Sequence, residues 1–336
     1  LSVSSHAYEA ELVDMDGRRL HVWRLPDGQR PGQVPRSESF RRAFVLPDGG
    51  LLAVLGGSWL YRLDRRGHVV WKVVGYFHHD ADIDAEGRFH VLARRPVSVA
   101  RLGGVKLFED YVQVVEADGS LGPEHSITLP VTRALREEVM ARARKGVMDV
   151  LHTNSLQILG PEHAAVNAGF VAGGYLISAR GLDLVAVVDP ATDAVTWKQQ
   201  GPWKAQHDPV ALPGGTLLVF DNHPPGPSKS IEIDLRTGAS VWSWGEDRGH
   251  YTECCGTNAR LANGNTLLVF TDEGVAVEVT PQGEAVWEWR SPYTARGVRA
   301  RVSRLMDVVR LPPAEELGWL RREKGPRALD REGEAG

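Results

Sequence analysis

The chain has 336 residues, of which 42% are hydrophobic and 24% charged, an ordinary composition for a globular protein with a large apolar core. Its net charge is -4 and its basic residues are scattered, so we expect no nucleic-acid partner and no anionic membrane surface. No apolar run reaches the roughly 20 residues that span a bilayer. The two cysteines, Cys254 and Cys255, are adjacent, which excludes a disulfide framework and paired zinc-finger spacing.

The predicted elements are short strands that meet at turns rich in glycine and aspartate. In four places a strand, a turn and a second strand follow one another, with a tryptophan four residues after the turn glycine or aspartate. These tryptophans are Trp71, Trp197, Trp242 and Trp287. A second kind of hairpin, Leu-Pro-Gly-Gly-Thr-Leu-Leu from Leu212 being one example, precedes the first kind. Two hairpins in series make a four-stranded unit.

The spacing of these units indicates a β-propeller. The last three tryptophans lie 45 residues apart, within the period of about 40 to 45 residues typical of a four-stranded blade. Five blades are predicted to start near Phe44, His79, His152, His207 and Cys255. A pair of β-sandwiches would explain the alternation of apolar residues but not the period.

The sixth blade is predicted to be split between the two ends of the chain. Residues 302–311 supply its inner strand, and residues 8–23 supply its outer hairpin. Joining the ends in one blade closes the ring and removes exposed edges. We therefore predict an all-β fold, a single six-bladed propeller over residues 1–312.

Two stretches interrupt the repeat. Residues 131–146 are rich in Ala, Arg, Glu and Leu and end in glycine, which predicts one helix inserted between blades two and three, where it could cover one mouth of the ring. Residues 313–336 form a charged C-terminal tail that we expect to be frayed or disordered.

Alignment of the blades on their first hairpin brings polar residues to one repeat position. His79, His152, His207 and Arg41 occupy it in four blades, and Gly256 and Met306 occupy it in the other two. Because the inner strands of a propeller start together around the central channel, these side chains are expected to converge there. A blade needs no histidine at this position for packing, so we predict a functional cluster. The neighbouring Asp80 and Asp208 are interpreted as structural.

Three chemistries are compatible with such a cluster. The histidines could bind a transition metal, with Cys254 or Cys255 as a soft additional ligand. One histidine could instead be a covalent nucleophile, or the channel could simply bind an anion. Asn154 shares a strand face with His152, and Arg180 lies in the next strand of that blade. An arginine is repelled by a metal ion but suits a tetrahedral oxyanion, which favours group transfer.

Several motifs resemble those of the bacterial arylsulfate sulfotransferases, in particular the compact branch of that family. The resemblance extends over residues 40–310 and is carried by Asp149-Val-Leu-His152-Thr-Asn154-Ser155, Leu176-Ile-Ser-Ala-Arg180, Gln206-His207-Asp208, Val219-Phe-Asp-Asn222, His78-His79-Asp80 and Arg260-Leu-Ala-Asn-Gly-Asn-Thr-Leu267. It implies a six-bladed propeller in which a histidine accepts a sulfuryl group from a phenolic sulfate ester and passes it to another phenol.

The resemblance also implies roles for individual residues. His207 would be the nucleophile, and His79, His152, Asn154 and Arg180 would bind the sulfuryl oxygens and exchange a proton with the phenol oxygen. The remaining expected substrate-binding residues are Arg41, Asn222 and His78. The implied partners are an aryl sulfate donor and a phenolic acceptor, with no cofactor, and the implied location is periplasmic or secreted.

Two alternatives remain open at this point. The first is a metalloenzyme that holds one transition metal ion with His79, His152 and His207, with or without Cys254 and Cys255, and acts on a small polar or sulfur-containing substrate. The second is a non-catalytic propeller that binds a ligand.

Overall fold

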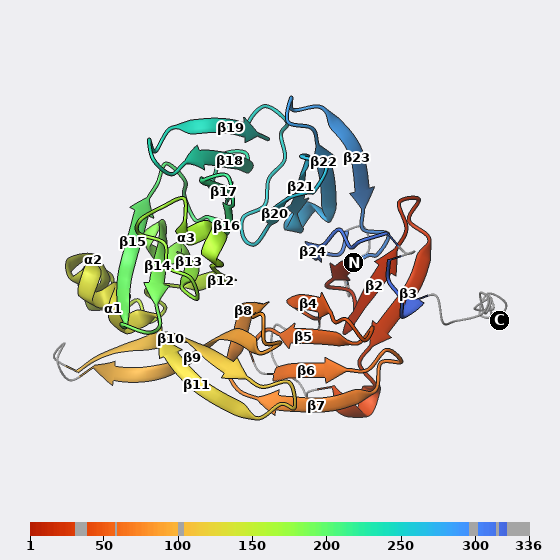
Figure 1. Ribbon diagram of the computed structural model, residues 1–336, viewed down its shortest axis with the longest axis horizontal. Helices are drawn as coiled ribbons and strands as arrows, with labels where there is room; N and C mark the ends of the chain where they lie inside the picture. Colours follow the sequence, from red (N-terminus) through yellow and green to blue (C-terminus); the bar gives the residue numbers. More distant parts are fainter. Residues whose placement is uncertain (31–38, 58, 100–103, 296–301, 314–315, 321–336) are drawn as a thin grey trace.

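Six four-stranded sheets are arranged in a ring (Figure 1). The computed structural model describes residues 1–30, 39–57, 59–99, 104–295, 302–313 and 316–320. Within each sheet neighbouring strands are antiparallel, and in five of the sheets they follow one another along the chain. The predicted all-β, six-bladed propeller is therefore confirmed.

The first three blades follow the N-terminal strands, and each is described from its inner to its outer strand. Blade 1 consists of β4 (Arg42–Val45), β5 (Leu51–Leu55), β6 (Trp59–Leu63) and β7 (Val69–Val74). Blade 2 consists of β8 (Phe77–Ile83), β9 (Phe89–Val99), β10 (Val105–Val115) and β11 (Leu121–Ser126). Blade 3 consists of β12 (Thr153–Ile158), β13 (Tyr175–Ala179), β14 (Leu184–Asp189) and β15 (Ala194–Gln200).

The other three blades complete the ring. Blade 4 consists of β16 (His207–Leu212), β17 (Thr216–Asp221), β18 (Lys229–Asp234) and β19 (Ser240–Trp244). Blade 5 consists of β20 (Thr257–Arg260), β21 (Thr266–Phe270), β22 (Val275–Val279) and β23 (Ala285–Arg290). Blade 6 consists of β24 (Leu305–Val308), β1 (Ser2–Ser4), β2 (Glu9–Val13) and β3 (Arg19–Arg24). Each of the five predicted blade starts lies within two residues of the first residue of an inner strand.

Blade 6 is closed by both ends of the chain, as predicted, but it contains a strand that the sequence did not reveal. The three-residue strand β1 lies between β24 and β2 and pairs Ser2 with Val308. The N-terminal ammonium extends this pairing by donating to the carbonyl oxygen of Val309 at 2.7 Å. A strand of three residues is too short to show an alternation of apolar and polar side chains, which is why the pattern missed it.

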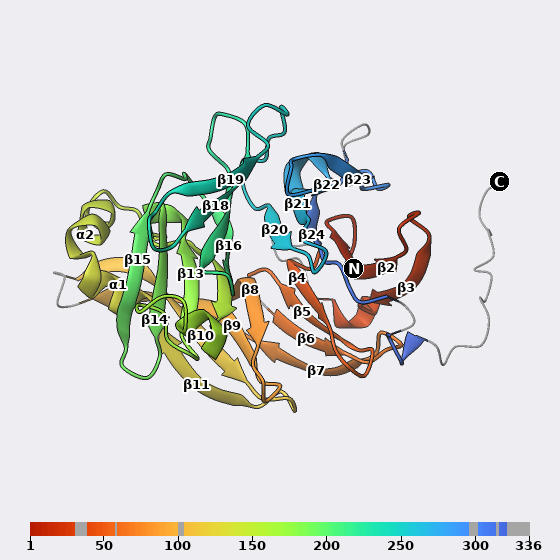
Figure 2. The ribbon, with the colours of Figure 1, turned by 45° about the horizontal axis from the view of Figure 1, so that its top comes forward.

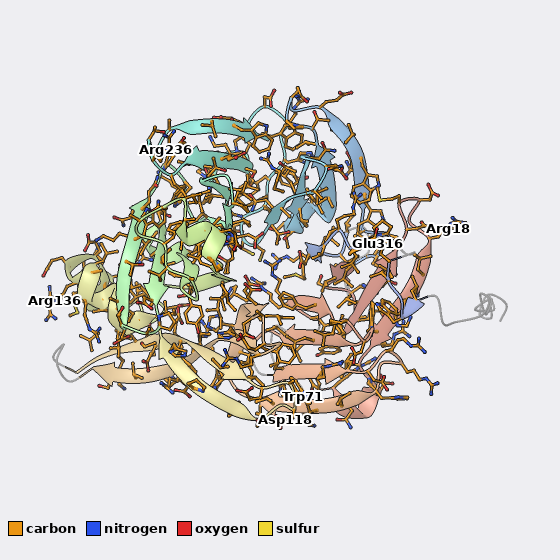
Figure 3. The ribbon with its side chains drawn as sticks, in the orientation of Figure 1. Arg18, Trp71, Asp118, Arg136, Arg236 and Glu316 are labelled. Carbon is orange, nitrogen blue, oxygen red and sulfur yellow. The ribbon has the colours of Figure 1, made fainter. Side chains whose placement is uncertain are left out.

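The repeated tryptophans connect neighbouring blades. For three of them the indole N–H donates to a carbonyl oxygen in the turn between the third and outer strands of the next blade. The pairs are Trp71 with Ala117 at 3.0 Å, Trp242 with Pro281 at 3.0 Å and Trp287 with Met15 at 3.2 Å. Figure 3 shows Trp71 beside Asp118 of that turn in blade 2. Trp197 instead packs edge to face against Phe170, with ring centroids 5.3 Å apart.

The apolar core lies between the blades. The contact of blades 3 and 4 is typical, because Val185 and Val187 of β14 pack with Leu217 and Val219 of β17 in one cluster of buried side chains. Both faces of a middle strand are therefore covered, and β5, β13, β21 and β22 are buried at every residue. The ring holds the six inner strands in fixed positions around its axis.

The predicted single helix over 131–146 is wrong in its detail. The segment forms two helices, α1 (Thr128–Ala134) and α2 (Arg136–Arg144), which are separated by Leu135. The backbone of Leu135 leaves the helical region (φ -136, ψ 50), and its side chain is 7% exposed within the apolar cluster of blades 2 and 3. The break thus allows both helices to bury their apolar residues against that cluster.

The two helices do not cover the centre of the ring. They pack against β10 and β15, and Figures 1 and 2 both show them at the outer side of blades 2 and 3. A third short helix, α3 (Pro161–Ala164), follows β12, and single 3-10 turns occur at η1 (Asp27–Gln29), η3 (Arg180–Leu182) and η4 (Thr271–Glu273). None of the helices in the described ranges is long and apolar enough to cross a membrane.

Part of the C-terminal tail is packed rather than frayed. Trp319 is 8% exposed, lies 5.6 Å from Trp23 between ring centroids, and accepts a hydrogen bond on its carbonyl oxygen from Arg65 at 2.8 Å. Residues 316–320 therefore cover the junction of blades 6 and 1. The expectation of disorder for residues 321–336 lies outside the described residues.

Candidate functional site

The aligned repeat position gathers around one small cavity to which all six blades contribute. Its walls are formed by Arg41, Arg42, His79, Asn154, His207, Asp208, Cys255, Gly256, Thr257 and Met306. The cavity encloses about 20 Å³, the room of about one water molecule. His79, His207 and Arg41 were predicted to meet, and the structure brings them together. His152 lies beside this cavity, with its ring 5.0 Å from that of His79.

An unusual backbone conformation marks the start of three inner strands. His79, His152 and Asp208 have φ angles of 54, 50 and 49 degrees, in the left-handed region that residues other than glycine rarely adopt. The strand pairing also shifts register at these places in blades 2, 3 and 4. Such bulges redirect side chains and are typical of functional sites, where the fold sustains local strain.

The imidazole of His207 is fixed in one tautomer by Asn222. The amide nitrogen Nδ2 of Asn222 donates to the carbonyl oxygens of Thr252 and Cys255, both at 2.9 Å, so its Oδ1 must face His207. That oxygen lies 2.7 Å from Nδ1 of His207, which therefore carries the proton. The other ring nitrogen, Nε2, keeps its lone pair and accepts a hydrogen bond from the backbone N–H of Cys255 at 3.1 Å.

Burial and positive charge keep the two cavity histidines neutral. Burial lowers the pKa of His207 well below its ordinary value, and the charges of Arg41 and Arg180 lower this pKa further. Burial and the charge of Arg41 lower the pKa of His79 in the same way. A neutral imidazole is the form in which a histidine can act as a nucleophile or accept a proton.

The site contains two guanidinium groups that are not neutralised. Among the residues that the structure describes, neither Arg41 nor Arg180 forms an ion pair with a carboxylate. Arg180 begins the turn η3, where its backbone N–H donates to the carbonyl oxygen of His152, and its buried Nε has no hydrogen-bond partner. The next residue must be glycine, because a Cβ on Gly181 would lie 2.2 Å from the carbonyl oxygen of Val150. Unpaired arginines beside a neutral histidine suit an anionic ligand.

His78 and His152 support His79 from two sides. Nδ1 of His78 lies 2.9 Å from Nδ1 of His79, so one ring donates to the other. His78 is only 4% exposed, and burial lowers its pKa to about 3. It was expected to bind substrate, but the structure places it behind His79 rather than in the cavity wall. His152 is oriented by the carboxylate of Asp149, which lies 2.8 Å from its Nδ1.

Asn154 and Asn222 occupy different layers of the site. Asn154 lines the cavity and is 6% exposed, and its Nδ2 donates to the carbonyl oxygen of Gln206 at 2.9 Å. Its Oδ1 is buried without a hydrogen-bond partner, so it is available to a ligand. Asn222 was expected to bind substrate, but it is fully buried and instead contacts His207.

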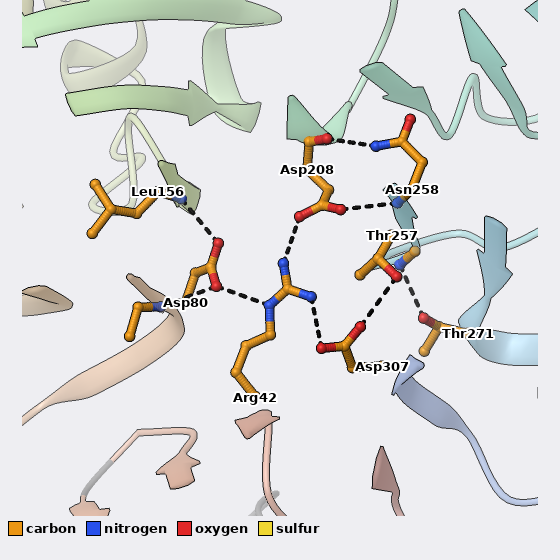
Figure 4. Close-up of polar contacts among 10 residues, drawn as sticks. Arg42, Asp80, Leu156, Asp208, Thr257, Asn258, Thr271 and Asp307 are labelled. Atoms are coloured by element: carbon orange, nitrogen blue, oxygen red, sulfur yellow. Dashed lines mark hydrogen bonds and ion pairs between the residues drawn. The ribbon is translucent and has the colours of Figure 1, made fainter. Parts of the chain in front are cut away.

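A cluster of one arginine and three aspartates, which the sequence did not reveal, lies at the centre of the ring (Figure 4). Arg42 forms ion pairs with Asp80 at 2.8 Å, with Asp208 at 2.5 Å and with Asp307 at 2.9 Å. These residues come from blades 1, 2, 4 and 6. Each directly follows the aligned position in its blade, so a comparison of the blades one residue later would have found the cluster. We call it the Arg42 hub.

The hub carboxylates also bind neighbouring inner strands. Asp80 accepts from the backbone N–H of Leu156 in blade 3, and Asp208 accepts from that of Asn258 in blade 5, both at 2.9 Å. Burial nevertheless raises the pKa of Asp208 to about 6, against the opposing effect of Arg42. The structural interpretation of Asp80 and Asp208 agrees with these contacts.

The two cysteines lie at the edge of the cavity as free thiols. Their sulfur atoms are 2.9 Å apart, and Cys255 is part of the cavity wall. Across the described ranges, no three side chains of His, Cys, Asp or Glu are grouped so that they could hold a metal ion. The metal-binding alternative of His79, His152 and His207 therefore stays a prediction without a preformed ligand set.

Comparison with known proteins was made by sequence and by structure. No curated protein matches it by sequence. Solved structures with a similar arrangement include a streptogramin B lyase, at 10% identity over 84% of this chain and 76% of that chain with a TM-score of 0.49. Another is the virginiamycin B lyase of Staphylococcus aureus, at 10% identity over 75% of this chain and 69% of that chain with a TM-score of 0.44.

A family model carries more information than these structures. The model described as Arylsulfotransferase (ASST) matches residues 124–292, which is half of the chain. The matched segment contains His152, Asn154, Arg180 and His207 but not His79 or Arg41, so it is shorter than the segment 40–310 over which the motifs resemble the family. It covers the blade that holds Arg180 and the blade that holds the anchored imidazole. The chain belongs to the arylsulfotransferase family.

Proposed function

We propose that the protein transfers a sulfuryl group from a phenolic sulfate ester to a phenolic acceptor through a covalent intermediate on His207. The observation that carries this proposal is the state of the His207 ring. Its Nδ1–H is anchored on Asn222, and its Nε2 carries a lone pair that accepts from the backbone N–H of Cys255. The charges of Arg41 and Arg180, neither of which has a carboxylate partner in the described part of the chain, act on the same ring. No cofactor takes part in the proposed reaction, and the expected location is outside the cytoplasm.

The first half-reaction forms a bond between nitrogen and sulfur. The sulfate group of the donor binds to Arg41 and Arg180, and Nε2 of His207 attacks sulfur while the bond from sulfur to the phenolic oxygen breaks. That oxygen leaves with the electron pair and takes a proton from His152, because His79 is held neutral and has no acidic proton to give. The imidazole becomes cationic, and Asn222 Oδ1 stabilises it by accepting from Nδ1–H.

The second half-reaction reverses these steps with a different phenol. His152, which gave up its proton in the first half-reaction, removes the proton of the acceptor hydroxyl, the phenolic oxygen attacks sulfur, and Nε2 of His207 leaves. The cavity holds about one water molecule, so a sulfate ester requires the wall to open. Arg41, a partly exposed side chain of the wall, is expected to move, and the Cys255 N–H must release Nε2.

The proposal is tested by trapping the intermediate. Incubation with an aryl sulfate in the absence of acceptor should add one sulfuryl group to the intact mass, and peptide mapping should find it on His207. His207→Ala should lose both the adduct and the transfer of sulfuryl to a phenol. His68→Ala changes an exposed histidine in the turn before the outer strand of blade 1, outside the cavity wall, so it is the matched control and should behave as the wild type. Transfer by His207→Ala at the wild-type rate would remove His207 from the mechanism.

Elemental analysis of protein purified without a polyhistidine tag separates this proposal from the metalloenzyme alternative. A stoichiometric transition metal that is lost in the His79, His152 and His207 variants would replace the covalent mechanism. If the protein instead retains full transfer activity after exhaustive chelation, the reaction proceeds on the side chains alone, as proposed.

A further inference from the structure

The vicinal cysteines are held in a conformation that brings their sulfur atoms together. In an extended strand successive side chains point to opposite faces, yet the sulfur atoms of Cys254 and Cys255 are 2.9 Å apart. The contact arises because Cys255 has a φ of 68 degrees, in the left-handed region, and Gly256 follows with a φ of 89 degrees. Gly256 admits no side chain, since a Cβ there would lie 2.4 Å from the ring of Phe220.

The same dipeptide controls the surroundings of His207. The backbone N–H of Cys255 donates to Nε2 of His207 at 3.1 Å, and its carbonyl oxygen accepts from Nδ2 of Asn222 at 2.9 Å. Asn222 in turn fixes Nδ1 of the imidazole. Both nitrogens of the His207 ring are therefore linked to the backbone of Cys255, one directly and one through Asn222.

We propose that Cys254 and Cys255 are a redox-active pair that closes to a vicinal disulfide, and that this oxidation displaces the backbone groups that hold His207. Adjacent α-carbons are about 3.8 Å apart, less than the roughly 4.4 to 6.8 Å that disulfides usually span. A ring closed between neighbours is accordingly strained and easily reduced, which is typical of a labile disulfide rather than a structural one.

The oxidation is balanced by a small disulfide as oxidant. The hydrogen bond between the two sulfurs raises the pKa of Cys254 and lowers that of Cys255 to about 6, so the proton on Cys254 first passes to Cys255 across the 2.9 Å contact. The thiolate of Cys254, whose side chain is partly exposed, then attacks one sulfur of the small disulfide and releases one small thiol. The buried Cys255 then attacks the sulfur of Cys254 in this mixed disulfide, which forms the bond between the two protein sulfurs and releases the second small thiol. The protein loses two electrons and two protons, and the small disulfide gains them.

The first experiment tests the disulfide without any assay of activity. The full-length protein is incubated with oxidised glutathione, its remaining thiols are blocked with iodoacetamide, and its intact mass is measured. Because the chain has only two cysteines, the expected product has lost two hydrogen atoms and carries no alkyl group, and dithiothreitol restores two alkylation sites. Cys254→Ser and Cys255→Ser each retain one thiol and should show a single glutathione adduct instead. A wild-type protein that carries two adducts, or that remains fully alkylated, overturns the proposal.

The second experiment tests the effect on His207 and rests on the proposed function. Displacement of the Cys255 carbonyl oxygen loosens Asn222, which orients the imidazole through Nδ1. This should lower sulfuryl transfer roughly tenfold, and dithiothreitol should restore it. Equal rates for the oxidised and reduced wild type would overturn the control of His207. If the reduced protein transfers no sulfuryl group but still forms the disulfide when it is oxidised, the proposed function is rejected and the redox pair is retained.

Discussion

Replacement of Arg42 by methionine tests whether this arginine has a structural role, in contrast to Arg41, which is proposed to bind substrate. Arg42→Met keeps the length of the apolar stem but leaves Asp80, Asp208 and Asp307 without a cation. The three carboxylates are 4%, 13% and 4% exposed, so water replaces the lost charge poorly. Breaking a buried ion pair by removing one partner costs about 3 to 5 kcal/mol of the free energy of unfolding, and we expect that loss at pH 7.5.

The loss should shrink as the pH falls, and the sign follows from the carboxylates. The pKa of Asp208 is already about 6 with Arg42 in place, and it rises further in the variant. A folded-state pKa above the unfolded value means that the folded protein binds more protons, so lowering the pH stabilises it. Between pH 7.5 and 5.5 one such proton should recover about 2 kcal/mol relative to the wild type, at about 1.4 kcal/mol per pH unit.

Urea denaturation at the two pH values measures this loss, and Arg41→Met is the matched control. Arg41 is adjacent in sequence but lines the cavity without an ion pair in the described part of the chain. Arg41→Met should change the free energy of unfolding by less than about 1 kcal/mol and should lower sulfuryl transfer. If Arg42→Met is as stable as the wild type at pH 7.5, or if Arg41→Met loses as much stability as Arg42→Met, then the Arg42 hub does not bear the structural role assigned to it.

Three further changes test individual contacts. Asn222→Ala should lower kcat roughly tenfold or more because the tautomer of His207 is no longer fixed. Asn222→Asp keeps a hydrogen-bond acceptor and should retain more activity. If Asn222→Ala has the same kcat as the wild type, Asn222 does not fix the tautomer. Burial gives His78 a folded-state pKa of about 3, below its unfolded value of about 6.5, so the wild type loses stability as the pH falls below 6.5. His78→Asn removes this loss. Its free energy of unfolding, measured by urea denaturation, should therefore rise by about 1.2 kcal/mol relative to that of the wild type between pH 6 and pH 5. Trp242→Phe removes the indole donor to Pro281 and should lower the free energy of unfolding by about 1 kcal/mol; an unchanged urea midpoint would show that this bond between blades adds nothing.

The blades could be predicted because each one is encoded locally. A turn glycine or aspartate fixes a hairpin, and a tryptophan four residues later binds the turn of the next blade, so both the strand pairing and the contact between blades recur with a fixed spacing. The inner strands could then be aligned by counting from the hairpins. Alignment predicts that Arg41, His79 and His207 meet, and they line one cavity, because in a repeat the distance along the sequence determines the position around the ring.

The features that the sequence did not reveal depend on contacts between segments that no repeat connects. Asn222 presents its Oδ1 to His207 because two backbone carbonyl oxygens bind its amide nitrogen. Every residue has a backbone carbonyl, so the sequence gives no sign of these two contacts. The break at Leu135 depends on the shape of the apolar cluster that receives that side chain. The short strand β1 is defined by its pairing with β24 on one side and β2 on the other, and β24 lies at the opposite end of the chain.

Two successive positions in the repeat, the aligned position and the residue after it, have different roles: the first carries the chemistry and the second stabilises the ring. The second position carries Arg42, Asp80, Asp208 and Asp307, whose charges cancel in part across the axis of the ring and tie the inner strands together. The first position is released from that task, so it can vary from Arg41 to His79 to Gly256 without loss of ring closure. A reactive histidine at the first position is therefore held by a rigid ring. It stays neutral because the nearby carboxylates bind Arg42 and backbone N–H groups instead of stabilising a protonated imidazole. Arg42→Met should test this division directly, since it alters the second position and leaves every side chain of the first in place.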